Sequence, residues 1–176
     1  AFLVRGINVG GRHKVVMEEF CHELKELGMS NVSSYINSGN FFFNSSLMKV
    51  ELLLVLERFL NKTYPFIKVF SLFTLEDYQN EVASLPKWWE DDFYRKDVLL
   101  YTERLDKNEM RNVMESLELG DEIIHLGQLG IYWGKFDKSS YNQTAYHKKL
   151  LKAPFYPSIT IRNARTFSKI GHFLRM

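Results

Sequence analysis

The chain contains the same order of predicted elements twice, and this repetition constrains the fold more than any other feature. In residues 1–73, apolar runs and helical periodicities follow one another as strand, helix, strand, strand, helix and strand. Residues 97–176 show the same order, and residues 74–96 form a connecting helix and linker. A β-α-β-β-α-β order is typical of a ferredoxin-like unit. The sequence therefore predicts an α+β protein, a tandem repeat of two ferredoxin-like units with antiparallel sheets.

The element boundaries follow from hydrophobic spacing and from residues that cap helices or form turns. Predicted strands cover Phe2 to Arg5, Val32 to Ile36, Phe41 to Phe43, Phe66 to Phe73, Asp97 to Thr102, Glu122 to Leu126, Ile131 to Trp133 and Ser158 to Ile161. Predicted helices cover Met17 to Leu27, Leu47 to Leu60 after capping serines Ser45 and Ser46, a segment from Thr74 to before Pro86, a segment capped by Asp106, a short segment around Gln143 to Leu151, and a segment from Asn163 to about Phe173.

Several predicted strands are apolar on both faces. Phe41, Phe42 and Phe43 are consecutive, as are Ile123 and Ile124. A half-exposed antiparallel strand would alternate apolar and polar residues. We therefore expect the sheet face that its own helices leave open to be covered by the other unit or by another subunit. The alternative is an aromatic platform on which nucleic-acid bases stack.

The composition narrows the class of protein. Of the 176 residues, 45% are hydrophobic and 14 are Phe, so the chain can build a sizeable core. The longest aliphatic run, Leu52 to Leu56, is too short to span a bilayer, and a single cysteine excludes an internal disulfide framework. These features predict a cytoplasmic protein with no membrane segment, and they leave open a homo-oligomer.

The net charge of +2 hides a strong asymmetry along the chain. Eight of the 23 Lys and Arg residues lie in residues 138–176, where there is no Asp or Glu, so this segment carries +8. Residues 1–137 hold 15 basic and 21 acidic residues and carry −6. Such separation predicts either an anionic partner for the basic segment or packing of that segment against the acidic body.

Three short polar stretches, each directly after a predicted strand, are the main candidates for a binding site. They span residues 5–14, 37–40 and 162–166, and none contains a carboxylate. Loops at strand ends present backbone N–H groups and short polar side chains to ligands. The sequence therefore predicts an anion-binding site. Its candidate ligand-binding residues are Arg5, Asn8, Gly10, Gly11, Lys14, Asn37, Ser38, Asn40, Arg162 and Asn163.

The predicted topology places two of these stretches together. The first two strands of a ferredoxin-like unit run parallel, so residues 5–14 and 37–40 leave the same sheet edge. Gly10 and Gly11 permit positive φ and exposed N–H groups, as in an anion nest. Residues 162–166 join only if the two units bring unlike edges together. In the alternative interpretation, the glycines only turn the chain and the asparagines satisfy loop backbone.

Other residues point less clearly to chemistry. Cys21 lies on the apolar face of the first helix, which predicts a buried, inert thiol. The five histidines lack metal-ligand spacing, and only His147, beside Tyr146 and two lysines, is kept as an acid–base candidate. The glycines match neither a Walker A loop nor a dinucleotide fingerprint. We therefore predict no metal and no cofactor.

Three motifs resemble those of a known family. Leu3 to Gly11, Tyr35 to Asn40 and Thr160 to Asn163 are similar in order and spacing to the signatures of the mainly bacterial domain-of-unknown-function family sixteen-ninety-seven (DUF1697). Val16 stands where the family pattern usually has Pro. The resemblance covers essentially the whole chain. It implies a cytoplasmic α+β protein with duplicated ferredoxin-like units, and it implies no established activity.

Three functions fit these observations. The first is a module that binds a phosphorylated ligand or nucleic acid through the three polar stretches. The second is an enzyme acting on a phosphorylated small molecule, with Arg and Lys stabilising charge, for which no nucleophile or base is evident. The third is an assembly protein whose polar loops are structural. Salt-dependent binding of nucleic acid would favour the first function, and turnover would favour the second.

Overall fold

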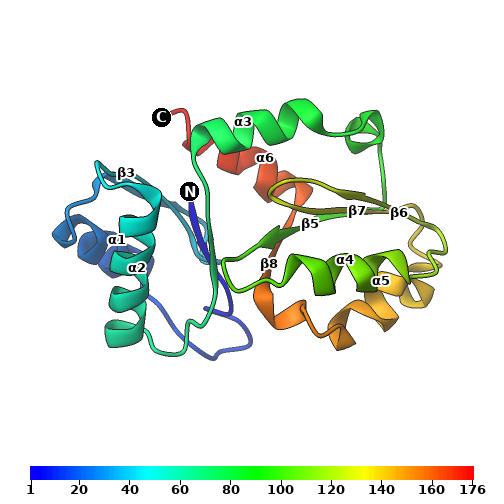
Figure 1. Cartoon of the computed structure of the whole chain (residues 1–176), viewed down its shortest axis with the longest axis horizontal. Helices are drawn as coiled ribbons and strands as arrows, with labels where there is room; N and C mark the ends of the chain where they lie inside the picture. Colours follow the sequence, from blue (N-terminus) through cyan, green and yellow to red (C-terminus); the bar gives the residue numbers. More distant parts are fainter.

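The computed structural model describes all 176 residues as two four-stranded antiparallel sheets with six α-helices (Figure 1). The strand order is β2-β3-β1-β4 in the first sheet and β6-β7-β5-β8 in the second, so corresponding strands occupy corresponding places. The strands are β1 (Phe2–Val4), β2 (Ser30–Tyr35), β3 (Asn40–Asn44), β4 (Phe70–Leu72), β5 (Arg95–Tyr101), β6 (Glu122–Leu126), β7 (Gly130–Lys135) and β8 (Ile159–Asn163).

The helices begin largely where the sequence predicts them. Thr74, Asp106 and Asn163 each accept a hydrogen bond from a backbone N–H of the following first turn, which confirms the three predicted caps. None of the helices is long and apolar enough to cross a membrane. The helices are α1 (Met17–Glu26), α2 (Lys49–Thr63), α3 (Leu75–Ser84), α4 (Lys107–Glu115), α5 (Ala145–Lys148) and α6 (Ala164–Phe173).

Three predicted boundaries are wrong. The serines do not cap α2; its N-cap is Met48, whose N–H donates to the Glu51 carboxylate at 3.1 Å. The strand predicted from Phe66 is confined to Phe70–Leu72, because a turn precedes it in which the Ile67 N–H donates to the Tyr64 carbonyl. The predicted helix from Gln143 shrinks to Ala145–Lys148, between short 3₁₀ turns.

Each sheet packs one face against helices of its own half. Between the first sheet, α1 and α2, Phe20 and Phe41 stack with ring centroids 4.1 Å apart in an apolar cluster that includes Leu56. Between the second sheet, α4 and α5, Trp133 lies fully buried beside Tyr146. Two separate cores therefore stabilise the two halves.

A third apolar cluster joins the halves. It takes Leu3 and Phe42 from the first sheet, Val98, Leu100 and Tyr132 from the second, and side chains of α3 and α6. Figure 1 shows α3 and α6 side by side above the strands of the second sheet. These sheet faces are covered within the chain, as the two-faced apolar strands predict, so Phe42 and Tyr132 are core residues rather than a platform for bases.

Candidate functional site

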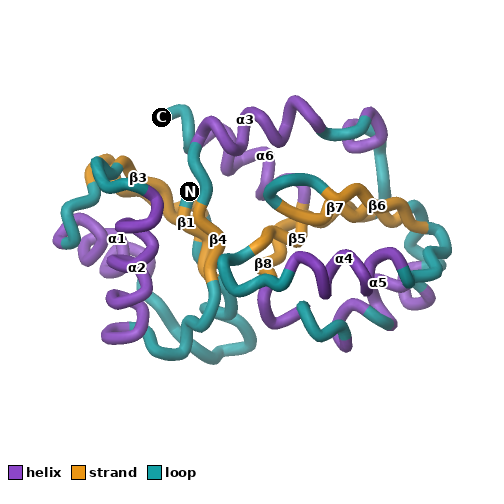
Figure 2. Tube along the Cα trace, viewed as in Figure 1, coloured by secondary structure: helices purple, strands orange, loops and turns teal.

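The loop after β1 contains a small projecting hairpin, residues 8–13, here called the finger. Its turn is closed by the Arg12 N–H, which donates to the Val9 carbonyl at 3.0 Å. Gly10 and Gly11 have φ values of +57° and +74°, as a type I′ turn requires at both central positions. A Cβ atom at either position would meet no other atom within 4 Å, so packing does not require glycine here. The positive φ of the backbone does. Figure 2 shows the long loop that carries the finger between β1 and α1.

The base of the finger is held by Asn8 and His13. The Asn8 amide accepts from the Val15 N–H at 2.9 Å and donates to the Val15 carbonyl at 3.1 Å. The same amide nitrogen donates to the Asn37 carbonyl at 2.9 Å. The His13 ring stacks on Phe66 with centroids 4.7 Å apart. Asn8 therefore positions the loop, and it brings the first two polar stretches together at one sheet edge.

Arg162 brings the third polar stretch to the same place, but as a buried structural residue. Its Nε donates to Asn40 Oδ1 at 2.6 Å, and its Nη2 donates to the carbonyls of Val4 and Ser38 at 3.0 and 2.8 Å. Its Nη1 donates to the Thr160 hydroxyl and to the Ile161 carbonyl. Burial lowers the pKa of the guanidinium to about 10. Every N–H group of Arg162 thus has an acceptor within the protein.

Three further predicted residues also use their polar groups internally. The Arg5 guanidinium lies over the Tyr156 ring at 4.5 Å and donates to the Tyr156 carbonyl at 2.8 Å. The fully buried Asn40 amide donates to the Tyr35 carbonyl and to Ser38 Oγ. The Asn163 side chain accepts from the Thr166 N–H at 2.8 Å and caps α6. These residues join the two halves or shape the hairpin.

The groups that remain open lie on the finger and just after it. The N–H groups of Gly10 and Gly11 have no acceptor within the protein. Arg12 and Lys14 are exposed, and neither lies in an ion pair. They border an open pocket of about 390 Å³ between the finger and α1. Its lining residues are Asn8, Gly11, Arg12, Lys14, Val15, Val16, Met17 and Asn37.

The first turn of α1 adds a positive pole to this pocket. Its N-cap is Val16, whose side chain cannot accept a hydrogen bond, so the N–H groups of residues 17–19 have no acceptor within the protein. The aligned peptide dipoles place a partial positive charge at this end, and the exposed side chains of Glu18 and Glu19 in the same turn oppose it. Val15, Val16 and Met17 are lining residues that lie outside the predicted polar stretches. An apolar residue at an N-cap position was the available signal.

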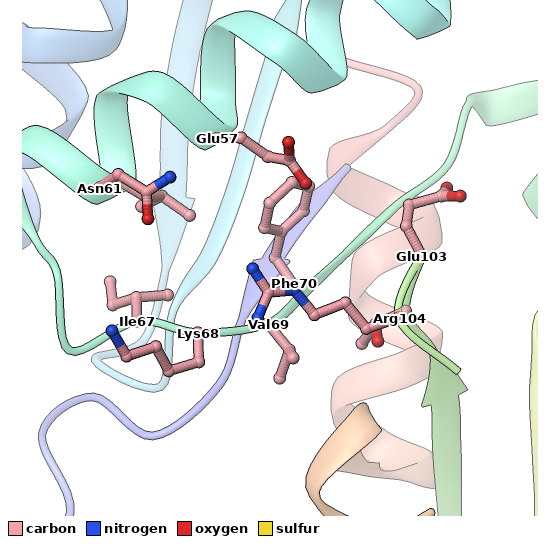
Figure 3. Close-up of a pocket in the computed structure, with 10 residues that line it drawn as sticks. Glu57, Asn61, Ile67, Lys68, Val69, Phe70, Glu103 and Arg104 are labelled. Carbon is pink, nitrogen blue, oxygen red and sulfur yellow. The ribbon is translucent and has the colours of Figure 1, made fainter. Parts of the chain in front are cut away.

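Two other cavities are poorer candidates. The cleft between α2 and the loop after β5 holds only about 20 Å³, roughly the room for one water molecule. Figure 3 shows Glu57 and Asn61 of α2 facing Glu103 and Arg104 across it. A groove of about 550 Å³ between β3 and the end of α6 is larger and lined mainly by apolar side chains. It presents no converging set of charged groups.

The remaining reactive candidates do not form a catalytic arrangement. Cys21 is only half-buried on α1, which corrects the prediction of a buried thiol, because its apolar neighbours cover one side. Burial still raises the pKa of the thiol, which disfavours the nucleophilic thiolate. His147 is exposed, and its ring lies 5.5 Å from that of Tyr141 rather than beside a carboxylate. The finger pocket therefore concentrates the groups that are free to meet a ligand.

Fold and site together describe an α+β protein with an open polar loop site. The chain belongs to the family described as proteins of unknown function, DUF1697, whose model matches residues 1–132. It is also similar to a solved conserved bacterial protein from Streptococcus pneumoniae, with 57% identity and a TM-score of 0.96, over 98% of this chain and 96% of that chain. No curated protein matches the chain. The family match includes the whole finger pocket and ends before Arg162.

Proposed function

We propose that this protein binds a phosphate-bearing ligand in the pocket between the finger and the start of α1. The observation that carries this proposal is that one cavity is lined by the unpaired cations Arg12 and Lys14, by Gly11 with its free N–H, and by the uncapped start of α1. No carboxylate lies among the lining residues. Helix N-termini and runs of free backbone N–H groups are recurrent phosphate-binding features. The site thus offers an anion both charge and directed donors.

The expected affinity is modest. A hydrogen bond to a charged group contributes about 1.5–3 kcal/mol, and such terms do not add fully. Two or three of them together correspond to a dissociation constant between about 1 mM and 1 μM. Tight binding would therefore need contacts beyond the phosphate. Val9, Val16 and Ile36 are unusually exposed around the finger and the adjoining turn, and they offer apolar surface for the rest of the ligand.

The size of the cavity favours a phosphorylated small molecule. Ligand pockets have volumes of about 300–1,000 Å³, and the finger pocket lies within this range. Nucleic acid is the second candidate, because the basic segment favours it. Seven of its eight cations are exposed, and none of the eight forms an ion pair. In that case, the segment would contribute to a salt-dependent attraction for the phosphate backbone.

Titration calorimetry tests the proposal with three probes: pyrophosphate, a nucleoside triphosphate and a 12-nucleotide single strand. We expect Arg12→Ala and Lys14→Ala each to weaken binding of a responding probe by about tenfold, which corresponds to one lost charged contact. Lys87→Ala removes an exposed cation outside this pocket and serves as the matched control. Absence of binding by all three probes at millimolar concentration, or equal binding by all variants, would reject the proposal.

The proposal extends to the architecture that presents the pocket. We infer that residues 1–73 and 97–176 are two ferredoxin-like units that arose by internal duplication, with residues 74–96 as their connection. The shared strand order and the recurring pattern of antiparallel pairing support this inference. The single cysteine supports a reducing, cytoplasmic setting.

A further inference from the structure

The outward side of α2 carries an unusual group of exposed apolar side chains. Leu47 and Met48 just before α2 and Val50 and Leu54 on the helix are all exposed, and Val50 and Leu54 keep 71% and 52% of their surface accessible. The opposite side of α2 is already buried in the core of the first half through side chains such as Leu56. A helix that is apolar on both sides normally lies between two packed layers. Only one of those layers is present here.

The other helices show that this fold does not require an apolar outer surface. The exposed residues of α1 include Glu18, His22 and Glu26. Those of α4 include Arg111 and Glu115. Both helices keep their apolar residues on the side that faces a sheet. The exposed apolar side chains of α2 therefore form a local feature, which calls for a partner surface.

Two charges on the same side indicate which partner fits. Glu51 and Arg58 are both exposed, and neither forms an ion pair within the chain; one oxygen of Glu51 accepts the Met48 N–H. They are seven residues apart, close to two helical turns, with Leu54 between them. If a second α2 lies antiparallel across a twofold axis near Leu54, each Glu51 faces the partner's Arg58. A parallel arrangement would instead place like charges together.

We propose that this face binds a second copy of the chain, with α2 packed antiparallel against its twofold-related partner. A twofold interface needs a surface complementary to itself, and an acidic end and a basic end flanking an apolar centre meet that requirement. The 15 residues of α2 span about 22 Å. One helix of this length covers a smaller contact than the interface of about 800 Å² per partner that is standard in stable complexes. We therefore expect a dimer that forms reversibly as the protein concentration rises.

Sedimentation velocity over a range of about 1–200 μM tests the dimer. We expect the mass to rise with concentration from 20.8 kDa toward twice that value. Leu54→Asp should give a monomer throughout the range, because it places a charge at the centre of the contact. Arg111→Glu on α4 is the matched control and should dimerise like the parent. Thermal unfolding of each variant checks that it is folded. A parent that stays monomeric at 200 μM, or a Leu54→Asp variant that dimerises like it, would overturn the proposal.

Charge reversal tests the antiparallel geometry itself. Glu51→Arg and Arg58→Glu should each weaken self-association at least tenfold, because each places like charges opposite one another. The double variant should recover most of the lost affinity. An equimolar mixture of the two single variants should form a heterodimer, because both ion pairs are then restored. Failure of both the double variant and the mixture to associate better than the single variants would exclude this arrangement.

Discussion

The two sheets share a strand order, but the loops at their corresponding ends differ in whether their polar groups have partners within the chain. After β1 and β2, the finger and the following turn leave backbone N–H groups and two cations open. After β6, the turn to β7 is closed by an internal anion. The N–H of Gln128 donates at 2.8 Å to the carboxylate of Glu81, a residue of α3 that is only 1% exposed. A shared strand order therefore does not decide whether the backbone N–H groups of these loops are free.

The second half also keeps other charges inside. Lys135 lies 2.6 Å from Asp97, and both side chains are buried. Arg95 pairs with the same carboxylate at 2.7 Å. Glu122 accepts from the N–H groups of Ala145 and Tyr146 at the start of α5. Each of these side chains has at least one partner within the fold, although Asp97 Oδ1 and Glu81 Oε1 are buried without one. The comparison teaches that a polar loop becomes a candidate binding site only when its own chain leaves its donors unsatisfied.

Replacing Arg162 has the largest expected effect. This residue belongs to one of the three polar stretches, but all its donors bind acceptors within the protein. Arg162→Ala leaves the Asn40 carboxamide and the Val4 carbonyl buried without their donor. We expect a loss of about 3–5 kcal/mol in the free energy of unfolding, measured by urea denaturation. Arg162→Lys should recover little, because an ammonium cannot reproduce the planar set of donors.

The matched control is Arg165→Ala, three residues further along. Arg165 is exposed on α6 and lies in no ion pair, so its loss should change stability by less than about 0.5 kcal/mol. Similar effects of the two substitutions would show that Arg162 is not the structural link between the halves.

Much of this architecture could be predicted from the sequence because its signals are local. Gly10 and Gly11 indicate the turn of the finger, and a polar residue before α3 and before α6 indicates the caps at Thr74 and Asn163. The adjacency of the first two polar stretches follows from the order of strands within one half. Local rules of this kind need no knowledge of how the halves pack.

The roles of Arg162 and Glu81 could not be predicted, because they depend on contacts distant in sequence. Arg162 meets Asn40 across 122 residues, and Glu81 meets Gln128 across 47. In the sequence, both look like ordinary polar residues at a loop and on an amphipathic helix. The finger pocket was predicted in part. Four of its lining residues, Asn8, Gly11, Lys14 and Asn37, are among the predicted site residues, whereas the contribution of Val16 comes from an absent cap.

Substitution of Glu81 has the second largest expected effect on stability. It tests whether the turn between β6 and β7 depends on the buried carboxylate. Glu81→Ala removes the acceptor for the Gln128 N–H and should lower the free energy of unfolding by about 1–3 kcal/mol. Glu81→Gln keeps an oxygen that can accept the Gln128 N–H. It should therefore cost less than the alanine variant. Equal stability of the alanine variant and the parent would show that the turn does not depend on an internal anion.

The buried charges of the second half should also appear in the pH dependence of stability. Burial lowers the pKa of Lys135 from 10.5 to about 8, although Asp97 opposes the shift. Between these values the unfolded chain binds more protons than the folded chain, so this residue makes stability rise with pH. We expect a rise of about 1 kcal/mol from pH 7.5 to 9. Urea denaturation at each pH measures the free energy of unfolding of the parent and of Lys135→Met, and this rise should be missing in the variant. If the free energies of the two proteins changed in parallel with pH, Lys135 would not be the residue responsible.

The smallest expected effect on stability concerns the exposed cations of the first half. Arg12 and Lys14 touch no acidic partner and are exposed, so replacing both with alanine should change the free energy of unfolding by less than about 0.5 kcal/mol. The same double variant should lose the calorimetric response to any phosphate-bearing probe that the parent binds. Loss of binding without loss of stability is the behaviour of cations kept for a ligand. A destabilisation above 1 kcal/mol would instead mean that these cations support the fold, as Arg162 does, and the contrast between the two ends of the molecule would no longer hold.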